Sequence, residues 1–359
     1  MGLEFSEGFG FEIGKEFDMW LFGNQNVESL RIKGNVKGLI KLLEDEDPEV
    51  RAGAADALSD FDKPEVISAL INTLADKNRE VRWRSAKSLE RLCRDKTDVL
   101  IQAFIDSKSI FQKVTLAYIL GRLGDKKAIA PLAEAQNFGD KYVRRASVIA
   151  LGRIRDERSL YYLIQSLKDP DADVRKRAVE SIGRIGILND EVKKTLLDSL
   201  KDENYEVRKA SAKTIERLGL KLEDNEELAL YLSALMRGAE LILLGDKAID
   251  ALEIALKDED WNIKKWASEV ISDIGGDKAI AILKKLAEDE DWTVRYHAVS
   301  ALGRLKQIDL LIKHLDDPDP NVRDLAIEYI KDFVKVIERK DSKKAEKLKE
   351  ILQKHNIQV

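Results

Sequence analysis

The chain has 359 residues, of which 44% are hydrophobic and 35% are charged, and its formal net charge is −5. It contains no apolar run of the roughly 18 residues that a membrane span requires, and we expect no secretory signal. The lone Cys93 excludes an internal disulfide framework, and the negative balance is unlike that of a dedicated nucleic-acid binder. These features predict a cytoplasmic protein without a membrane partner, and the abundant interspersed charges would also suit a thermophile.

A Val-Arg pair, or a conservative replacement of it, recurs along the chain with a spacing of 31 residues in the first half. The pairs are Val50-Arg51, Val81-Arg82, Gln112-Lys113, Val143-Arg144 and Val174-Arg175, followed less evenly by Val207-Arg208, Ile263-Lys264, Val294-Arg295 and Val322-Arg323. Nine units are clear, and the 56-residue gap before Ile263 leaves room for a tenth, degenerate unit. A repeat this short predicts a solenoid.

Each unit reads as two helices joined by a turn. In the fifth unit, apolar residues at helical spacing predict a first helix, helix A, with Leu160, Leu163, Ile164 and Leu167 on its buried face. Asp169-Pro170-Asp171 ends helix A, because proline cannot continue it and aspartate caps the next helix. Helix B follows with the stripe Val174, Ala178, Ile182 and Ile185. Glycine is the expected C-cap at Gly124, Gly186, Gly219 and Gly275.

The helix-B pattern of Asp, Val-Arg, a small residue and Leu-Gly-Arg-Leu-Gly is present at residues 120–124 and, in part, at 302–305. It resembles HEAT-like repeats of the phycobilisome-lyase type over roughly residues 36–335. The resemblance implies an all-α, right-handed alpha-alpha superhelix of nine to ten two-helix repeats, with the B helices lining the concave face. It does not imply a function, because the matching positions are those that stack one repeat on the next.

The pattern divides the chain into three parts. Residues 1–35 are an atypical aromatic and acidic cap or arm, 36–340 the solenoid, and 341–359 a basic capping helix. Within the solenoid, residues 219–245 are irregular, and the apolar spacing from Glu226 to Leu244 predicts one long helix with Gly238 inside it. Residues 1–28 contain six acidic residues, five glycines and one lysine, Lys15. Two interpretations stand for this segment: a cover over the first helix pair, or an arm that docks on a partner or on a basic groove.

Two ladders of basic residues follow from the repeat. For the anchor arginines, the resemblance implies a bond to the acidic turn of a neighbouring repeat, so we expect them to be structural. The second ladder lies about ten residues further on and has fewer obvious partners. With nearby aromatic and basic residues it gives the candidate partner-binding set: Arg91, Arg122, Arg153, Arg184, Arg217, Tyr118, Arg145 and Arg177.

The candidate basic strip coincides with an uneven charge distribution. Residues 107–184 contain 16 Lys or Arg against 9 Asp or Glu, a balance of +7 that leaves −12 for the remainder of the chain. Such a strip suits an acidic partner. The alternative is a solvated face that nearby acidic turns neutralise, since ion pairs on helical surfaces are common and weak.

A secondary aromatic cluster lies in the late repeats. Its members are Trp261, Trp266, Trp292, Tyr296 and His297. Trp261 and Trp292 occupy equivalent turn positions, which favours packing between repeats over a ligand cage. Trp266 and His297 are equivalent helix-B positions that we expect on the groove, near Asp273 and Arg304. By residue type alone, this combination is similar to the alkylpurine DNA glycosylases built from HEAT-like repeats.

These features together predict a protein-binding scaffold, not an enzyme. We find no catalytic, cofactor or metal motif: none of the three histidines is followed by glutamate, and Cys93 lies far along the chain from His297. The expected partner is a protein or peptide with an acidic or extended segment, bound along the concave face of repeats three to five. Nucleic-acid binding through the same strip is the alternative, and the glycosylase-like enzyme is a third. The sequence leaves the oligomeric state open.

Overall fold

The computed structural model describes residues 25–358, and every regular element in that range is a helix. The all-α prediction is therefore confirmed. The chain divides into two compact units, Met1–Ser166 and Leu167–Val359. None of the helices in the described range is both long enough and apolar enough to cross a membrane.

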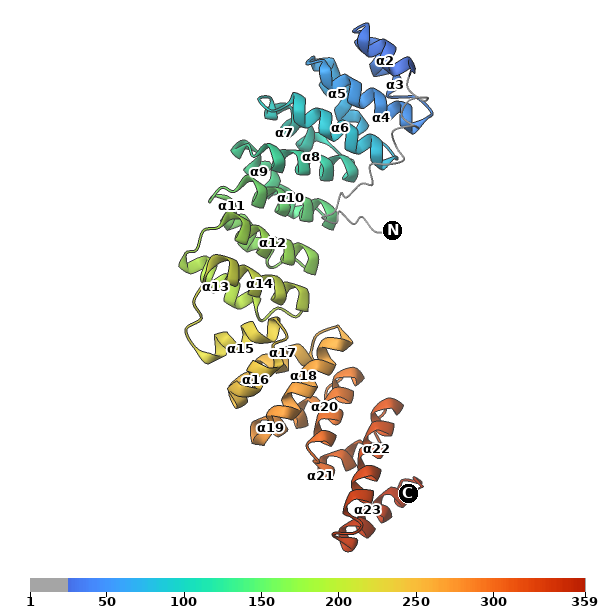
Figure 1. Cartoon of the computed structure of the whole chain (residues 1–359), viewed down its shortest axis with the longest axis vertical. Helices are drawn as coiled ribbons and strands as arrows, with labels where there is room; N and C mark the ends of the chain where they lie inside the picture. Colours follow the sequence, from blue (N-terminus) through green and yellow to red (C-terminus); the bar gives the residue numbers. More distant parts are fainter. Residues whose placement is uncertain (1–24, 359) are drawn as a thin grey trace. The chain divides into compact units, whose positions relative to one another are not determined.

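The first unit contains ten α-helices and three short 3-10 segments within its described residues. They are α2 (Gln25–Ile32), α3 (Val36–Leu42), α4 (Pro48–Ala57), η1 (Leu58–Asp60), α5 (Pro64–Thr73), α6 (Arg79–Leu92), α7 (Thr97–Asp106), α8 (Ile110–Leu123), η2 (Lys126–Ala128), α9 (Ile129–Glu134), η3 (Ala135–Asn137), α10 (Lys141–Ile154) and α11 (Ser159–Ser166). Helices α3, α5, α7 and α9 form one layer, and their partners α4, α6, α8 and α10 form the other (Figure 1).

The second unit continues the same construction. Its elements are α12 (Ala172–Ile185), α13 (Asp190–Ser199), α14 (Tyr205–Leu218), α15 (Asn225–Ala234), α16 (Gly238–Leu244), η4 (Gly245–Ala248), α17 (Ile249–Leu256), α18 (Trp261–Ile274), α19 (Gly276–Leu286), α20 (Trp292–Arg304), α21 (Ile308–Leu311), η5 (Ile312–His314), α22 (Pro320–Ile337) and α23 (Ser342–Lys354). Within each unit, a helix pair packs on the pairs beside it in the sequence, which is the arrangement of a solenoid.

The ends of the B helices follow the predicted turn chemistry. Asp47, Asp171 and Asp319 each accept a hydrogen bond from a backbone N–H of the first turn that follows them. At the other end, Gly124 and Gly186 adopt the left-handed conformation, with φ of 73° and 82°, which glycine enters without steric cost. The capping predictions are confirmed, so the repeat boundaries rest on local backbone chemistry.

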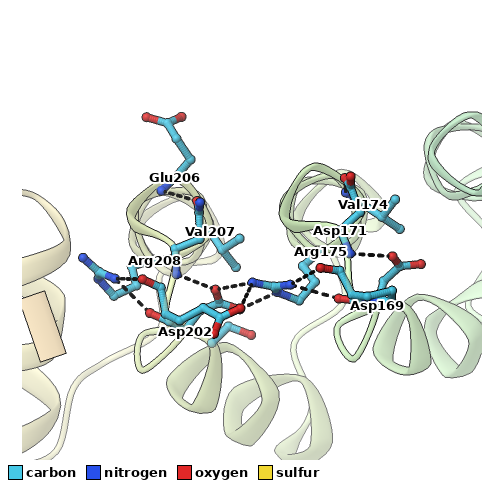
Figure 2. A network of polar contacts seen from close by, with 12 residues as sticks. Asp169, Asp171, Val174, Arg175, Asp202, Glu206, Val207 and Arg208 are labelled. Atoms are coloured by element: carbon cyan, nitrogen blue, oxygen red, sulfur yellow. Dashed lines mark hydrogen bonds and ion pairs between the residues drawn. The ribbon is translucent and has the colours of Figure 1, made fainter. Parts of the chain in front are cut away.

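The anchor arginines hold the turns together, as expected. Arg175 donates to the backbone oxygens of Asp169 and Pro170 in its own turn, and forms a two-pronged ion pair with Asp202 in the next turn at 2.8 and 2.9 Å. Figure 2 shows Arg208 repeating the first half of this pattern on the backbone of Asp202. Arg51 with Asp76 and Arg295 with Asp317 make equivalent pairs. Arg51, Arg175 and Arg295 therefore each tie their own turn to the following one.

The structure corrects the prediction of one long helix between Glu226 and Leu244. The chain forms two helices, α15 and α16, which break at Met236, a residue with a φ of 56°. The backbone N–H of Arg237 bonds to the oxygen of Leu232, five residues back, a helix-ending arrangement that usually employs glycine. Gly238 consequently begins α16 instead of lying inside a helix. The pair α15 and α16 is the degenerate tenth unit for which the spacing left room.

Cys93 is buried, and the last helix packs on the one before it. Cys93 is fully buried at the end of α6, and burial raises the pKa of its thiol to about 11, which agrees with its expected role as a small buried residue. Helix α23 packs on α22 through Leu348 and Leu352. The glycine-rich and aromatic part of the predicted N-terminal cap or arm, residues 1–24, lies outside the described residues.

Candidate functional site

A groove of about 470 Å³ lies on the B-helix layer of the first unit, across α4, α6 and α8. We call it the α4–α6–α8 groove. Its lining residues are Arg31, Asp56, Ser59, Trp83, Ala86, Lys87, Ser88, Glu90, Arg91, Arg94, Tyr118 and Arg122. Three of these, Arg91, Tyr118 and Arg122, were predicted as partner-binding residues.

Helix α6 supplies the floor of the groove. Trp83, Lys87 and Arg91 follow one another at intervals of four residues, so they share one face of the helix, and Arg94 lies in the turn just after α6 ends at Leu92. All four are exposed: 40% of Trp83 is accessible, and 65% of the Arg91 side chain is. An exposed tryptophan beside three cations can contact both apolar and acidic groups of a ligand.

Acidic residues neutralise part of this basic face. Asp60, at the end of η1, pairs with Arg91 at 3.2 Å and with Arg31 at 2.6 Å. Glu90 pairs with Arg122 at 3.0 Å, across from α6 to α8. A hydrogen bond to Asp60 is the main reason that the pKa of Arg31 lies above its ordinary value. Arg31, Arg91 and Arg122 therefore each line the groove while paired with a carboxylate of this chain.

Two other cations of the groove are not neutralised in this way. Within residues 25–358, neither Lys87 nor Arg94 forms an ion pair with a carboxylate, although the Lys87 ammonium lies 5.4 Å from the Trp83 ring centre. Five cations face two carboxylates, Asp56 and Glu90, among the lining residues. The groove is thus positive overall.

Tyr118 joins the third and fourth repeats. The guanidinium of Arg153, on α10, lies 4.6 Å from the centre of the Tyr118 ring, and that of Arg122 lies 5.8 Å away. Arg122 also donates a hydrogen bond to the Tyr118 hydroxyl at 3.3 Å, and this bond is the main reason that the pKa of Arg122 is raised. The structure therefore brings together three of the predicted residues, Tyr118, Arg122 and Arg153.

The remaining predicted residues lie outside the groove. On α10, the Arg145 guanidinium lies 5.3 Å from the centre of the Tyr142 ring. Arg177 and Arg184 lie on α12 and Arg217 on α14, in the second unit, where Arg177 pairs with Glu180 at 2.8 Å. Repeats one to three form the groove, whereas the sequence pointed to repeats three to five.

Sequence reasoning missed Arg31, Trp83, Lys87 and Arg94. A signal for the last three was present, because Trp83, Lys87 and Arg94 share the helical spacing of Arg91. Unlike the predicted arginines, these three residues do not recur at equivalent positions of successive repeats. Arg31 could not be found in this way, since it lies in α2, before the first anchor.

The secondary aromatic cluster is a packing contact between α18 and α20. The Trp261 ring lies 6.0 Å from that of Trp292, 5.2 Å from Tyr296 and 4.2 Å from His297. His297 is only 2% exposed, so the expectation that it lies on the concave surface of the late repeats is wrong. Burial also lowers its pKa to about 4. Trp266 packs beside Gly238 at the start of α16. The favoured interpretation, packing between repeats, agrees with these contacts.

The other feature noted beside this cluster is an ion pair between neighbouring helices. Arg304, at the end of α20, pairs with Asp273 of α18 at 2.7 Å. Nowhere in residues 25–358 do three or more His, Cys, Asp or Glu side chains gather in a way that could hold a metal ion.

The comparisons with known proteins concern the repeat. Of solved structures, YibA of Escherichia coli is 21% identical, with a TM-score of 0.41, and the match covers 83% of this chain and 98% of YibA. The complex of CpcE and CpcF of phycocyanin lyase from Nostoc sp. PCC7120 is 19% identical, with a TM-score of 0.34, and the match covers 61% of this chain and 92% of that one. Human deoxyhypusine hydroxylase is 21% identical, with a TM-score of 0.31, and the match covers 74% of this chain and 95% of the hydroxylase chain. Likenesses this distant carry no argument about function.

The family assignment rests on the sequence of the repeats. A comparison with curated proteins found no match. The family of HEAT repeats, by contrast, matches residues 36–114, 97–182, 162–240, 236–303 and 282–359. These stretches overlap and together extend over the whole stack of helix pairs. The chain therefore belongs to the HEAT-repeat family.

Proposed function

We propose that this HEAT-repeat protein is a binding scaffold that holds an acidic, extended segment of a protein partner in the α4–α6–α8 groove. The observation that carries the proposal is that two cations of the groove lining, Lys87 of α6 and Arg94 of the turn after it, have no carboxylate partner within residues 25–358. Carboxylates of a partner would form ion pairs with these two cations. Trp83 and Tyr118 offer apolar contact between them.

The helical framework supports binding of an extended segment. Most groove residues come from α4, α6 and α8, whose backbones are fixed by stacking, so they lose little freedom when a ligand arrives. An extended segment would carry most of the ordering cost, which gives modest affinity over a long contact. Lys87 lies on α6 and Arg94 lies in the turn just after it, and because both line the same groove, one segment can reach both.

The direct test is binding of a fluorescein-labelled peptide of alternating glutamate and phenylalanine to the full chain, measured by fluorescence anisotropy. We expect the double variant Lys87→Glu and Arg94→Glu to weaken binding by roughly tenfold or more, because it reverses the two charges that would meet the carboxylates. The proposal is wrong if this variant binds the peptide as tightly as the unaltered chain does.

A matched control separates the groove from net charge. Lys63 and Lys108 are exposed, belong to the same unit and do not line the groove. Lys63→Glu with Lys108→Glu changes the net charge by the same amount. We expect it to leave peptide affinity within about twofold of the unaltered chain, since exposed charges outside the site act only through screened long-range fields. An equal loss in both double variants would indicate a non-specific charge effect.

Nucleic-acid binding is the second candidate, and the exposed Trp83 beside Arg91 and Arg94 favours it, because bases stack on such surfaces. Single-stranded oligothymidylate is the probe. A phosphate backbone releases counterions on binding, so its affinity would fall steeply with salt. We expect the acidic peptide to bind with the shallower salt dependence and the oligonucleotide to bind more weakly, because Asp56, Asp60 and Glu90 repel a continuous line of phosphates.

A further inference from the structure

The first 24 residues carry the chemistry that the groove lacks. Residues 1–24 contain five carboxylates, at Glu4, Glu7, Glu12, Glu16 and Asp18, against the single Lys15. They also contain six aromatic residues. The segment is therefore acidic and aromatic, whereas the groove is basic and has two aromatic side chains in its lining.

The segment is joined to the chain at the edge of the groove. It leads directly into α2, and Arg31 of that helix lines the groove. From residue 25 to Arg31 the distance along the helix is about 9 Å. Twenty-four extended residues reach roughly 80 Å, while three neighbouring helices about 10 Å apart span only about 20 Å. Length therefore does not limit access to any part of the groove.

The alternative role, a cover over the first helix pair, is filled at least in part by α2. This helix packs on both α3 and α4, and its Val27 is only 4% exposed. Leu30 approaches so close to α3 that a methyl group added at Gly38 would lie 3.0 Å from it. The five carboxylates of residues 1–24 are complementary in charge to the cations of the groove.

We propose that residues 1–24 of this chain bind in the α4–α6–α8 groove, with their carboxylates beside Lys87 and Arg94 and their aromatic rings against Trp83 and Tyr118. The inference rests on the proposed function in that both use the same groove. A tethered segment acts at an effective concentration in the millimolar range, so an external acidic partner must displace it.

The test uses the full chain and a short bis-maleimide cross-linker. Phe9→Cys with Ser59→Cys places one thiol in the segment and one in the groove lining, without removing a cation. Phe9→Cys with Glu65→Cys is the matched control, because Glu65 is exposed on α5, in the other helix layer. The native Cys93 does not interfere, since it is fully buried and its pKa is raised to about 11.

We expect the groove pair to cross-link within one chain about tenfold faster than the control pair, as the local concentration predicts. Replacing the four glutamates by glutamine and Asp18 by asparagine should abolish this preference. The same replacements, made in the chain without added cysteines, should tighten binding of the glutamate-phenylalanine peptide. Equal cross-linking of the two pairs, unchanged by the amide replacements, would overturn the inference.

Failure of the inference can be distinguished from failure of the proposed function. If the peptide binds through Lys87 and Arg94 while the groove pair shows no preference, the groove binds acidic segments but not this one, and only the inference falls. If the groove pair cross-links preferentially but the peptide does not bind even after the amide replacements, the proposed function falls and the tethered contact stands.

Discussion

Arg51, Arg175 and Arg295 each bond to two kinds of acceptor at once, the carbonyls of their own turn and a carboxylate of the next, which is a reason for arginine at this position. Arg175 is 7% exposed and bonds both to turn carbonyls and to Asp202. The pair with Asp202 raises the pKa of Arg175, so its charge persists despite burial. Within residues 25–358, Lys113, at the same position of the third repeat, donates hydrogen bonds only to the carbonyls of Phe104 and Ile105, and burial lowers its pKa. The Lys113 ammonium can bond to the carbonyls of its own turn, but within residues 25–358 it forms no ion pair with the next turn.

We predict that Arg175→Leu lowers the free energy of unfolding by about 3 kcal/mol, because it leaves the half-buried Asp202 without its charged partner. Arg323→Leu is the comparison, since among the described residues Arg323 bonds only to the carbonyls of Asp317 and Pro318. We expect this variant to lose about 1 kcal/mol of unfolding free energy. Urea denaturation of both variants measures the difference. Equal losses would show that the carbonyl bonds alone stabilise the turn.

At the scale of elements, the ion pair that follows α14 does not involve the degenerate pair α15 and α16. Arg208 of α14 pairs at 2.9 Å with Asp258, which precedes α18, and both side chains are almost completely buried. In the regular repeats the equivalent carboxylate belongs to the next turn, as Asp202 does for Arg175. The Arg208–Asp258 pair thus connects α14 to the turn before α18, while α15 packs on α17 and α16 packs on α18.

Close approach of the B helices depends on glycine at a few positions. A Cβ atom at Gly121 of α8 would lie 2.7 Å from the Cα of Ala150 in α10. We predict that Gly121→Ala destabilises the chain by about 1–3 kcal/mol, because backbone must move to admit it. Gly139→Ala, where nothing lies within 4 Å, is the control and should be nearly neutral. Thermal unfolding compares them; similar stability of the two variants would contradict the close packing of α8 on α10.

At the scale of the whole molecule, each helix pair contacts its neighbours in the sequence, so a local change should remain local. Alanine at Gly303 of α20 would overlap the ring of Tyr329 in α22. We predict that Gly303→Ala speeds amide hydrogen exchange in α20 and α22 while α12 and α14 of the same unit keep their protection. Mass spectrometry of exchanged peptides measures this. Uniform loss of protection across the unit would indicate one cooperative core instead.

Repeated features were predictable, and single features were not. The spacing of Val50-Arg51 and its equivalents was sufficient for the repeat, and Gly124 and Gly186 were sufficient for helix ends, because both depend on local backbone chemistry. Met236 was missed because a residue other than glycine rarely adopts a positive φ. His297 was misplaced, since helical spacing alone did not show that its side chain is buried.

The sequence by itself determined the class of fold and the position of almost every turn, since caps, prolines and apolar spacing act within a few residues. The groove was decided only by the tertiary structure. Arg31, Trp83 and Tyr118 come from three helices that are distant in sequence, and only stacking brings them together. Stacking also decides which cations are neutralised, because the partner of Arg91 lies 31 residues away, at Asp60 of the preceding repeat.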